Sequence, residues 1–192
     1  MKLQVIIGST REGRVSDRLA KWIAAEAAKL EGAEAELIDL AEYDLPFLNE
    51  PISPQYNPDR KPLPEAARLL GKFSEADAFI LVSPEYNRSY SAALKNALDY
   101  IDFQFEKKPV GLVSHGVTGG AQAVAHLRGV LPGLLAVTVP RAVFFVGQVG
   151  EAFDESGAVK TGANVPQASV DSLLEDLKWY SDALAGARVK KS

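Results

Sequence analysis

The sequence predicts an α/β fold in which helices cover both faces of a parallel β-sheet, giving a three-layer sandwich. Short apolar runs that suit buried strands alternate along the chain with longer segments of helical periodicity. Parallel strands need crossover helices between them, so the alternation indicates a parallel sheet. The length of 192 residues and a hydrophobic content of 47% favour a single domain, residues 1–192, with one core.

Apolar runs mark the candidate strands, and amphipathic segments mark the candidate helices. The strands are expected at residues 3–7, 36–40, 78–82, 110–113 and 136–146, the last of them bent at Pro140. The helices are expected at residues 15–30, 64–73, 93–101, 124–131 and 170–184, where apolar residues recur with helical spacing. This pattern suits a five-stranded, flavodoxin-like sheet of order 2-1-3-4-5. Right-handed crossovers place the carboxyl ends of all strands at one edge, where such sheets bind ligands.

Three stretches fall outside this alternation. Residues 43–64 contain six prolines, and so long a loop in a compact domain is a functional or interface element or, alternatively, a rigid surface connection. Residues 147–166 contain four glycines and are expected to form a mobile flap before the last helix. Residues 188–192 are expected to be a solvated end of the chain.

Composition excludes several classes of function. With 21 basic and 25 acidic residues the net charge is −4, so the chain has no overall attraction for nucleic acid. Cysteine is absent, which excludes disulfides, thiolate catalysis and iron–sulfur clusters. The two histidines, His115 and His126, lack the spacing of a metal site, so no metal is expected. No signal peptide or membrane-spanning run is recognisable, and we expect a cytoplasmic protein without a membrane partner.

The first predicted strand ends in the loop Gly-Ser-Thr-Arg-Glu-Gly-Arg, residues 8–14. Glycines, hydroxyls, the arginines Arg11 and Arg14, and the start of a helix are the components of a phosphate site. Arg and Val follow the second glycine where a Walker A loop has Lys and Ser or Thr. Thr also replaces the second glycine of the dinucleotide fingerprint, so neither motif is present. The alternative interpretation is a tight turn in which Ser9 or Ser16 caps the helix.

The third and fourth predicted strands are followed by two further unusual loops. In Ser-Pro-Glu-Tyr-Asn-Arg-Ser-Tyr, residues 83–90, Asn87 can pair with the imide edge of a flavin and the tyrosines can supply a flat wall. Alternatively, this loop is a turn before a helix capped by Ser91. Residues 114–120 carry three glycines, which let the backbone pass close to a planar ligand. We expect His115 to contact ligand or solvent there rather than to act as an acid or base.

The motifs at residues 8–14, 83–87 and 92–100 together resemble the NADPH-dependent FMN reductase family, which includes bacterial quinone, chromate and azo-dye reductases. The specific part of the match is Pro-Glu-Tyr-Asn followed by Leu-Lys-Asn-Ala, and the match extends roughly over residues 3–146. The resemblance implies a flavodoxin-like homodimer or homotetramer that binds flavin mononucleotide (FMN) at the sheet edge.

The resemblance also implies which residues bind FMN. Ser9, Arg11, Arg14 and Ser16 would hold the phosphate, Pro84, Glu85, Tyr86 and Asn87 would line the isoalloxazine ring, and Ser114, His115 and Gly116 would approach its other edge. One departure from the family pattern follows Ser16, where Asp-Arg stands near the place at which some relatives have an asparagine that contacts phosphate.

By the same resemblance, the protein is an FMN-dependent oxidoreductase. It would pass electrons from NADPH or NADH to a small-molecule acceptor such as a quinone, an azo compound, chromate or free flavin. Because the flavin performs such chemistry, we expect no catalytic side chain. Two alternatives stay open, a non-enzymatic flavodoxin-type electron carrier and a flavin-free binding module on the same fold. Arg11, Arg14 and the mild net charge argue against the carrier, whose phosphate loop relies on hydroxyls and amides.

Overall fold

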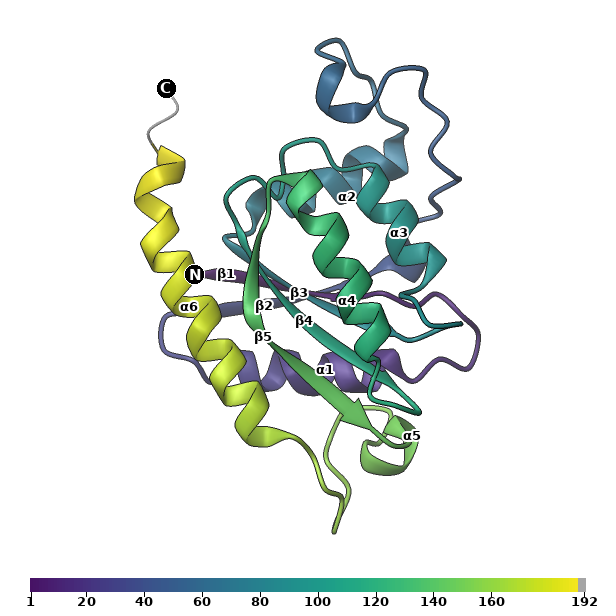
Figure 1. Cartoon of the computed structure of the whole chain (residues 1–192), viewed down its shortest axis with the longest axis vertical. Coiled ribbons are helices and arrows are strands. Elements are labelled where there is room, and N and C mark those ends of the chain that lie inside the picture. The colour runs from purple at the N-terminus through teal and green to yellow at the C-terminus, as the bar shows by residue number, and fades with distance from the viewer. Residues whose placement is uncertain (190–192) are drawn as a thin grey trace.

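The computed structural model describes residues 1–189 of the chain. At its centre lies a sheet of five parallel strands in the order β2-β1-β3-β4-β5, which confirms the predicted topology (Figure 1). The strands are β1 (Lys2–Ile7), β2 (Glu34–Asp39), β3 (Ala78–Pro84), β4 (Pro109–Gly116) and β5 (Val137–Val146).

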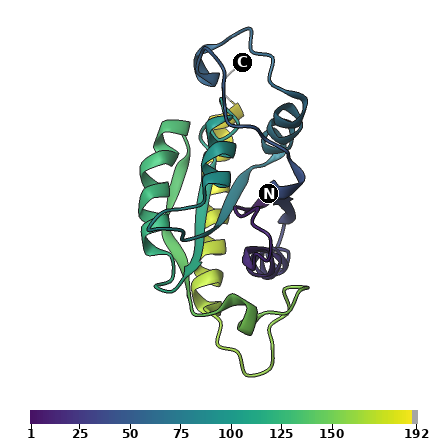
Figure 2. The ribbon, with the colours of Figure 1, turned by 90° about the vertical axis from the view of Figure 1, so that its right-hand side faces the viewer.

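Helices cover both faces of this sheet, as a three-layer sandwich requires (Figures 1 and 2). One face is covered by α1 (Ser16–Ala27) and α6 (Gln167–Val189), and the other by α2 (Pro64–Glu75), α3 (Ala92–Asp99) and α4 (Ala121–Val130). Among residues 1–189, no helix combines the length and the apolar character needed to cross a membrane.

Each face of the sheet has its own apolar core, because successive strand residues point to opposite sides. Leu3, Val5 and Ile7 of β1 pack with α1 and α6, whereas Ile6 packs with α2 and α3. Every residue of β3 is buried, since this strand is central and covered on both faces. The loops that follow β1 and β3 therefore start from the buried middle of the sheet.

The strand β5 is continuous but irregular, which confirms the predicted bend at Pro140. Thr138 pairs with Val110 and Ala142 pairs with Leu112, so the stretch 139–141 bulges out of the ladder. Proline has no amide hydrogen to donate, and edge strands and bulges are the places that tolerate it.

The two segments near the C-terminus differ from the sequence-based expectation. Part of residues 147–166, expected to form a mobile flap, packs against the core, because the segment includes the short helix α5 (Val149–Ala152) and the fully buried Phe153. The Phe153 ring lies 5.1 Å from that of Trp22, on the core side of α1. Arg188 is not a solvated end, since its guanidinium lies 3.4 Å from Asp77 and is largely buried. The last residues of that prediction, 190–192, lie outside the described part of the chain.

The proline-rich segment 43–64 lies against α3 at one corner of the molecule (Figure 1). It follows the single turn η1 (Leu40–Glu42) and contains a second one, η2 (Pro54–Tyr56). Asn96 on α3 donates to the carbonyls of Leu45 and Pro46 and accepts from the amide of Leu48. The segment is thus fixed to the fold by side-chain hydrogen bonds rather than by regular secondary structure.

Candidate functional site

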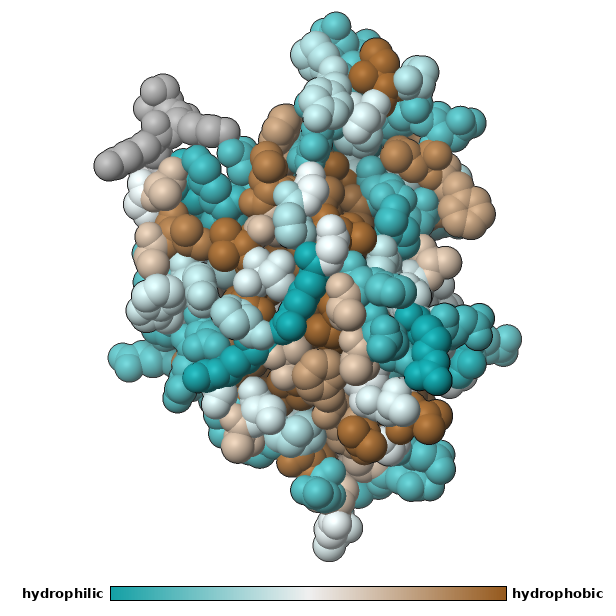
Figure 3. All heavy atoms as spheres, in the orientation of Figure 1, coloured by the Kyte–Doolittle hydropathy of each residue, from teal (hydrophilic) through white to brown (hydrophobic). Residues whose placement is uncertain are grey.

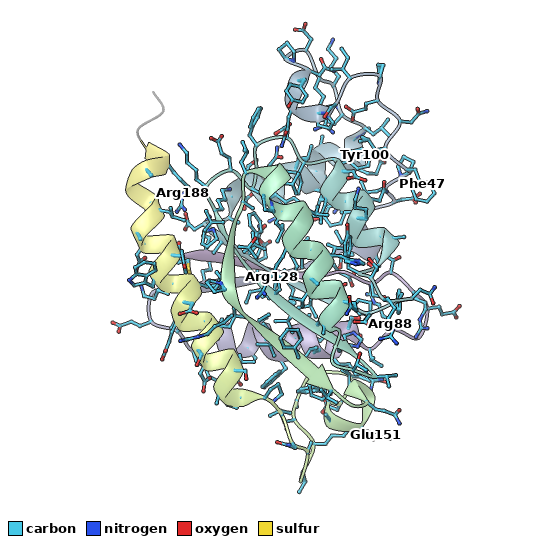
Figure 4. The ribbon with its side chains drawn as sticks, viewed as in Figure 1. Phe47, Arg88, Tyr100, Arg128, Glu151 and Arg188 are labelled. Carbon is cyan, nitrogen blue, oxygen red and sulfur yellow. The ribbon has the colours of Figure 1, made fainter. Side chains whose placement is uncertain are left out.

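Three loops meet at the carboxyl edge of the sheet, after β1, β3 and β4. They comprise residues 8–16, 83–90 and 114–120, and hydrogen bonds described below connect each of them to another. Arg88 in the second loop projects from this edge, beside the end of α4 at which that helix begins (Figure 4). The parallel topology therefore brings together the three motifs that the sequence singled out.

The first loop presents free backbone donors. Within residues 1–189, the amides of residues 9–13 donate no hydrogen bond, and the N-cap residue of α1, Val15, supplies no side-chain cap. Ser9 and Ser16 therefore do not cap the helix, contrary to the alternative interpretation of this loop. Unpaired amides beside an uncapped helix N-terminus form a site for an anion, because the helix dipole adds positive potential there.

The two arginines of this loop differ in their surroundings. Arg14 forms a bidentate ion pair with Asp39 and donates to the Ser9 carbonyl at 2.6 Å. Arg11 is exposed and lies over the Tyr86 ring, 5.5 Å from its centroid, with no hydrogen-bond acceptor among the described residues. Asp39 also accepts from the Ala41 amide at 2.9 Å. Arg11 is thus the arginine of this loop that is free to meet an anion.

The second loop contains a tight two-residue turn. Tyr86 and Ser89 exchange both backbone hydrogen bonds, at 2.8 and 3.0 Å, so that Asn87 and Arg88 occupy its corner. Both corner residues have positive φ angles, 49° and 68°. The Tyr86 hydroxyl lies 3.0 Å from the hydroxyl of Ser9, which joins this turn to the first loop. The predicted cap at Ser91 is present as well, since its hydroxyl accepts from Leu94 at 3.1 Å.

Glu85 connects the second loop to the third. Its amide donates to the His115 carbonyl at 2.9 Å, which extends the pairing of β3 with β4. Its carboxylate accepts from the Gln122 amide at 2.9 Å, in the first turn of α4. A carboxylate at a helix N-terminus is stabilised by the helix dipole, so Glu85 is occupied with capping α4.

His115 is buried rather than in contact with solvent, which corrects that part of the expectation. Its Nε2 lies 2.8 Å from the hydroxyl of Ser16, which is also buried. Burial, together with the nearby charge of Arg11, lowers the pKa of His115 to about 4. The imidazole is therefore neutral near pH 7 and can donate from Nε2 to the Ser16 oxygen, which leaves the Ser16 hydroxyl hydrogen for another acceptor.

A hollow of about 530 Å³ opens between the second and third loops. It is lined by Glu85, Asn87, Arg88, Val117 and Thr118, and the Val117 side chain is 94% exposed. Among residues 1–189, no group of three acidic or histidine side chains is arranged to hold a metal ion. The hollow thus combines the apolar Val117 with an amide and a cation, and its one carboxylate, Glu85, is already bonded to the Gln122 amide, so the cation is available to an organic anion.

The structure places the predicted site residues in three sets. At the sheet edge, Tyr86 contacts Ser9 and Arg11, and His115 contacts Ser16; the charge of Arg11 also acts on His115. Pro84 and Gly116 end β3 and β4, while the Ser114 hydroxyl donates to the Ser83 carbonyl within the sheet. Asn87 and Glu85 border the hollow, and Arg14 is held by Asp39. The sequence analysis did not select Arg88. It could have been singled out because it follows Asn87 at a turn position that favours glycine.

Comparison with known proteins places these features in a family context. The sequence pattern of a family described as NADPH-dependent FMN reductase matches residues 1–151. An NAD(P)H-dependent FMN reductase of Schizosaccharomyces pombe is 32% identical over 161 residues, which is 80% of each chain. An FMN-dependent NADPH-azoreductase of Staphylococcus aureus is 36% identical over 151 residues, covering 74% of this chain and 76% of that one.

The fold also resembles solved structures. The flavoenzyme FerB of Paracoccus denitrificans, an NAD(P)H:(acceptor) oxidoreductase, superimposes with a TM-score of 0.67 at 25% identity. The similarity covers 96% of this chain and 97% of FerB. The likeness therefore extends beyond the region matched by the family pattern.

Proposed function

The chain belongs to the NADPH-dependent FMN reductase family, and on this premise we propose that it passes electrons from NAD(P)H through bound FMN to a quinone or azo compound. Family membership makes the protein an oxidoreductase that uses FMN and a nicotinamide co-substrate. The proposal adds the class of acceptor and the residues that hold the cofactor.

The first loop carries the proposal for the FMN phosphate. The unpaired amides of residues 9–13, the exposed guanidinium of Arg11 and the hydroxyl of Ser16 offer several donors to one anion. His115 would position that hydroxyl through its Nε2, which lies 2.8 Å from the Ser16 oxygen. Arg14 would act chiefly by holding the loop to Asp39, because its donors are already directed there.

The second and third loops support a planar ligand beside that phosphate. Asn87 offers a donor and an acceptor to an imide edge, and Val117, which lines the same hollow, offers apolar surface. Bound FMN would supply the redox chemistry between NAD(P)H and the acceptor. The residues around the hollow would orient the partners, and an open apolar wall suits an aromatic acceptor such as a quinone or azo dye.

The test is an absorbance spectrum of the purified protein mixed with FMN, followed by NADPH and a panel of quinone, azo dye, chromate and free FMN. We expect flavin absorbance that stays with the protein and NADPH oxidation that is fastest with the quinone or the azo dye. A flavin-loaded protein that does not oxidise NADPH would favour the electron carrier. A protein that retains no flavin would favour the binding module.

We also propose that the chain assembles as a homodimer or homotetramer through the segment 43–64. Phe47 and Tyr56 on this segment are 81% and 78% exposed, and Phe103 beside it is 51% exposed. Phe47 projects outward from the molecule (Figure 4), and apolar side chains surface at the same corner (Figure 3). Exposed apolar groups gathered in one place are typical of an interface. Light scattering after size-exclusion chromatography would give the mass; a monomer would contradict this proposal.

A further inference from the structure

Two arginines have no hydrogen-bond acceptor among residues 1–189, and both lie at the carboxyl edge of the sheet. Every arginine lies within the described residues, and the following donate to a carboxylate or a backbone carbonyl: Arg14, Arg18, Arg60, Arg68, Arg128, Arg141 and Arg188. Arg11 and Arg88 do not. The free guanidinium groups therefore gather at the candidate site instead of being spread over the surface.

Arg88 occupies a backbone position that does not favour arginine. It is the second corner residue of the turn between Tyr86 and Ser89, with a φ of 68°. Two-residue turns with positive φ at both corners favour Asn followed by Gly, and here the Asn87 is followed by Arg. A non-glycine residue in this region strains the backbone, and among residues 1–189 the exposed Arg88 side chain has no hydrogen bond or ion pair that would offset that strain. The side chain is thus better explained by a ligand than by the fold.

The turn that carries Arg88 is braced from several sides. The Ser89 hydroxyl lies 3.0 Å from Nδ1 of His126 on α4, and the Tyr86 hydroxyl lies 3.0 Å from Ser9. The nearby carboxylate of Glu85 accepts from the α4 amide of Gln122. The turn is therefore held in place before a ligand arrives, which lowers the entropic cost of binding. Because Glu85 already serves the α4 N-terminus, Arg88 retains its charge for an external anion.

We propose that Arg88 binds a phosphate group of the nicotinamide dinucleotide co-substrate. FMN has a single phosphate, which the first loop is equipped to hold with Arg11 and the free amides of residues 9–13. Arg88 stands instead at the hollow bordered by Val117. NAD(P)H brings a pyrophosphate and, in NADPH, a further 2′-phosphate to such a site, and guanidinium groups pair well with phosphate. This inference rests on the proposed use of NAD(P)H by the FMN-loaded protein.

The test compares Arg88→Ala with the wild type, both loaded with FMN, using three hydride donors. These are NADPH, NADH and the phosphate-free 1-benzyl-1,4-dihydronicotinamide. We expect the KM for NADPH to rise about tenfold or more, because a charged hydrogen bond is lost, while the phosphate-free donor is used equally well. An effect on NADPH alone assigns Arg88 to the 2′-phosphate, and an equal effect on NADH assigns it to the pyrophosphate. Either result supports the proposal.

A binding measurement gives a readout independent of turnover. Calorimetric titration with adenosine 2′,5′-bisphosphate should show weaker binding to Arg88→Ala than to the wild type. The affinity for FMN should fall far less than that for the bisphosphate, since Arg88 lies outside the phosphate loop. Equal kinetics with all three donors, together with equal binding of the bisphosphate, would overturn the proposal.

Two further variants separate a ligand role from a structural one. Arg88→Gly relieves the backbone strain, so it should unfold at the same or a higher temperature while losing NADPH affinity as Arg88→Ala does. Arg141→Ala removes an equal charge from the exposed pair with Asp176 and should leave the KM for NADPH unchanged. A wild type that oxidises no NADPH would instead contradict the proposed function itself. The two failures are therefore distinguishable.

Discussion

Arg60 in the segment 43–64 and Arg88 at the sheet edge show two opposite uses of the same side chain. The Arg60 side chain is only 6% exposed, and its guanidinium donates to Glu50 at 2.8 and 2.9 Å, to the Tyr100 carbonyl at 2.7 Å and to Asp102 at 3.3 Å. Arg88 is exposed and donates to nothing within the described chain. The donor nitrogens of Arg60 are all directed to groups of the fold, whereas those of Arg88 remain available to a ligand.

The contrast shows how the number of acceptors around a cation separates stability from binding. A buried guanidinium is tolerated only where hydrogen bonds to acceptors offset its desolvation penalty. The bonds of Arg60 to its acceptors therefore hold the segment 43–64 in place. Burial by itself lowers the pKa of Arg60, but the hydrogen bonds and charge of Glu50 outweigh it and the pKa is raised. An exposed arginine without acceptors does not stabilise the fold in this way, and its donors are free to bind an external anion.

The largest effect on stability is expected when Arg60, whose donor nitrogens all have acceptors, is replaced. Arg60→Met should lower the free energy of unfolding by about 3 kcal/mol, because it leaves Glu50 and Asp102 without their shared cation. This value is at the low end for a buried pair, since these carboxylates are 21% and 26% exposed. Urea denaturation followed by circular dichroism gives the value. Arg88→Met is the matched control and should leave stability almost unchanged; equal losses in both variants would abolish the contrast.

His115 extends the comparison to a buried base that lacks a carboxylate. Its imidazole forms a hydrogen bond with the Ser16 hydroxyl, and its pKa is lowered to about 4 by burial and by Arg11. The unfolded chain, with a histidine pKa of about 6.5, therefore binds more protons than the folded one between pH 6.5 and 4. Stability contributed by this group is complete above pH 6.5 and is lost as the pH falls toward 4, by about 3 kcal/mol in total.

The measurement is the unfolding free energy of flavin-free protein against pH, for the wild type and His115→Gln. The difference between the two curves isolates the histidine from the carboxylates that also titrate in acid. We expect the variant to lose less stability than the wild type between pH 6.5 and 4. Parallel curves would mean that His115 is not buried as a neutral base.

The fold was predictable because apolar periodicity reports burial directly. The strand at residues 78–82 is buried on both faces, and its unbroken apolar run indicated this. Pro140 likewise marked the bulge in β5, since proline cannot complete a ladder. The burial of Phe153 was missed because the glycines around it suggested a loop. A loop sequence does not reveal that the Phe153 ring packs against Trp22.

The candidate site was only partly predictable, for a different reason. The three loops could be located because strand order fixes which ends of strands meet. The pairing of Arg14 with Asp39 could not be predicted, because no local rule connects two side chains so far apart in sequence. The same holds for His115 and Ser16. Whether the predicted residues bind FMN stays a prediction that mutation can test.

The smallest of the expected effects distinguishes the two arginines of the first loop. Arg11→Ala should weaken FMN binding by about ten- to a hundredfold, the loss of one charged hydrogen bond, or about 1.5–3 kcal/mol. It should leave the unfolding free energy of the flavin-free protein unchanged, because Arg11 has no acceptor in the fold. Arg14→Ala should lower that free energy, since it frees Asp39 and removes the bond to the Ser9 carbonyl.

Riboflavin, which lacks the phosphate, supplies the control for this pair. It should bind poorly to the wild type, and Arg11→Ala should not weaken it further, because the substitution removes a partner that riboflavin does not use. Flavin fluorescence quenching measures both ligands on the same protein. If Arg11→Ala bound FMN as tightly as the wild type does, an unpaired guanidinium at this edge would not indicate a phosphate site. The same inference for Arg88 would then lose its basis.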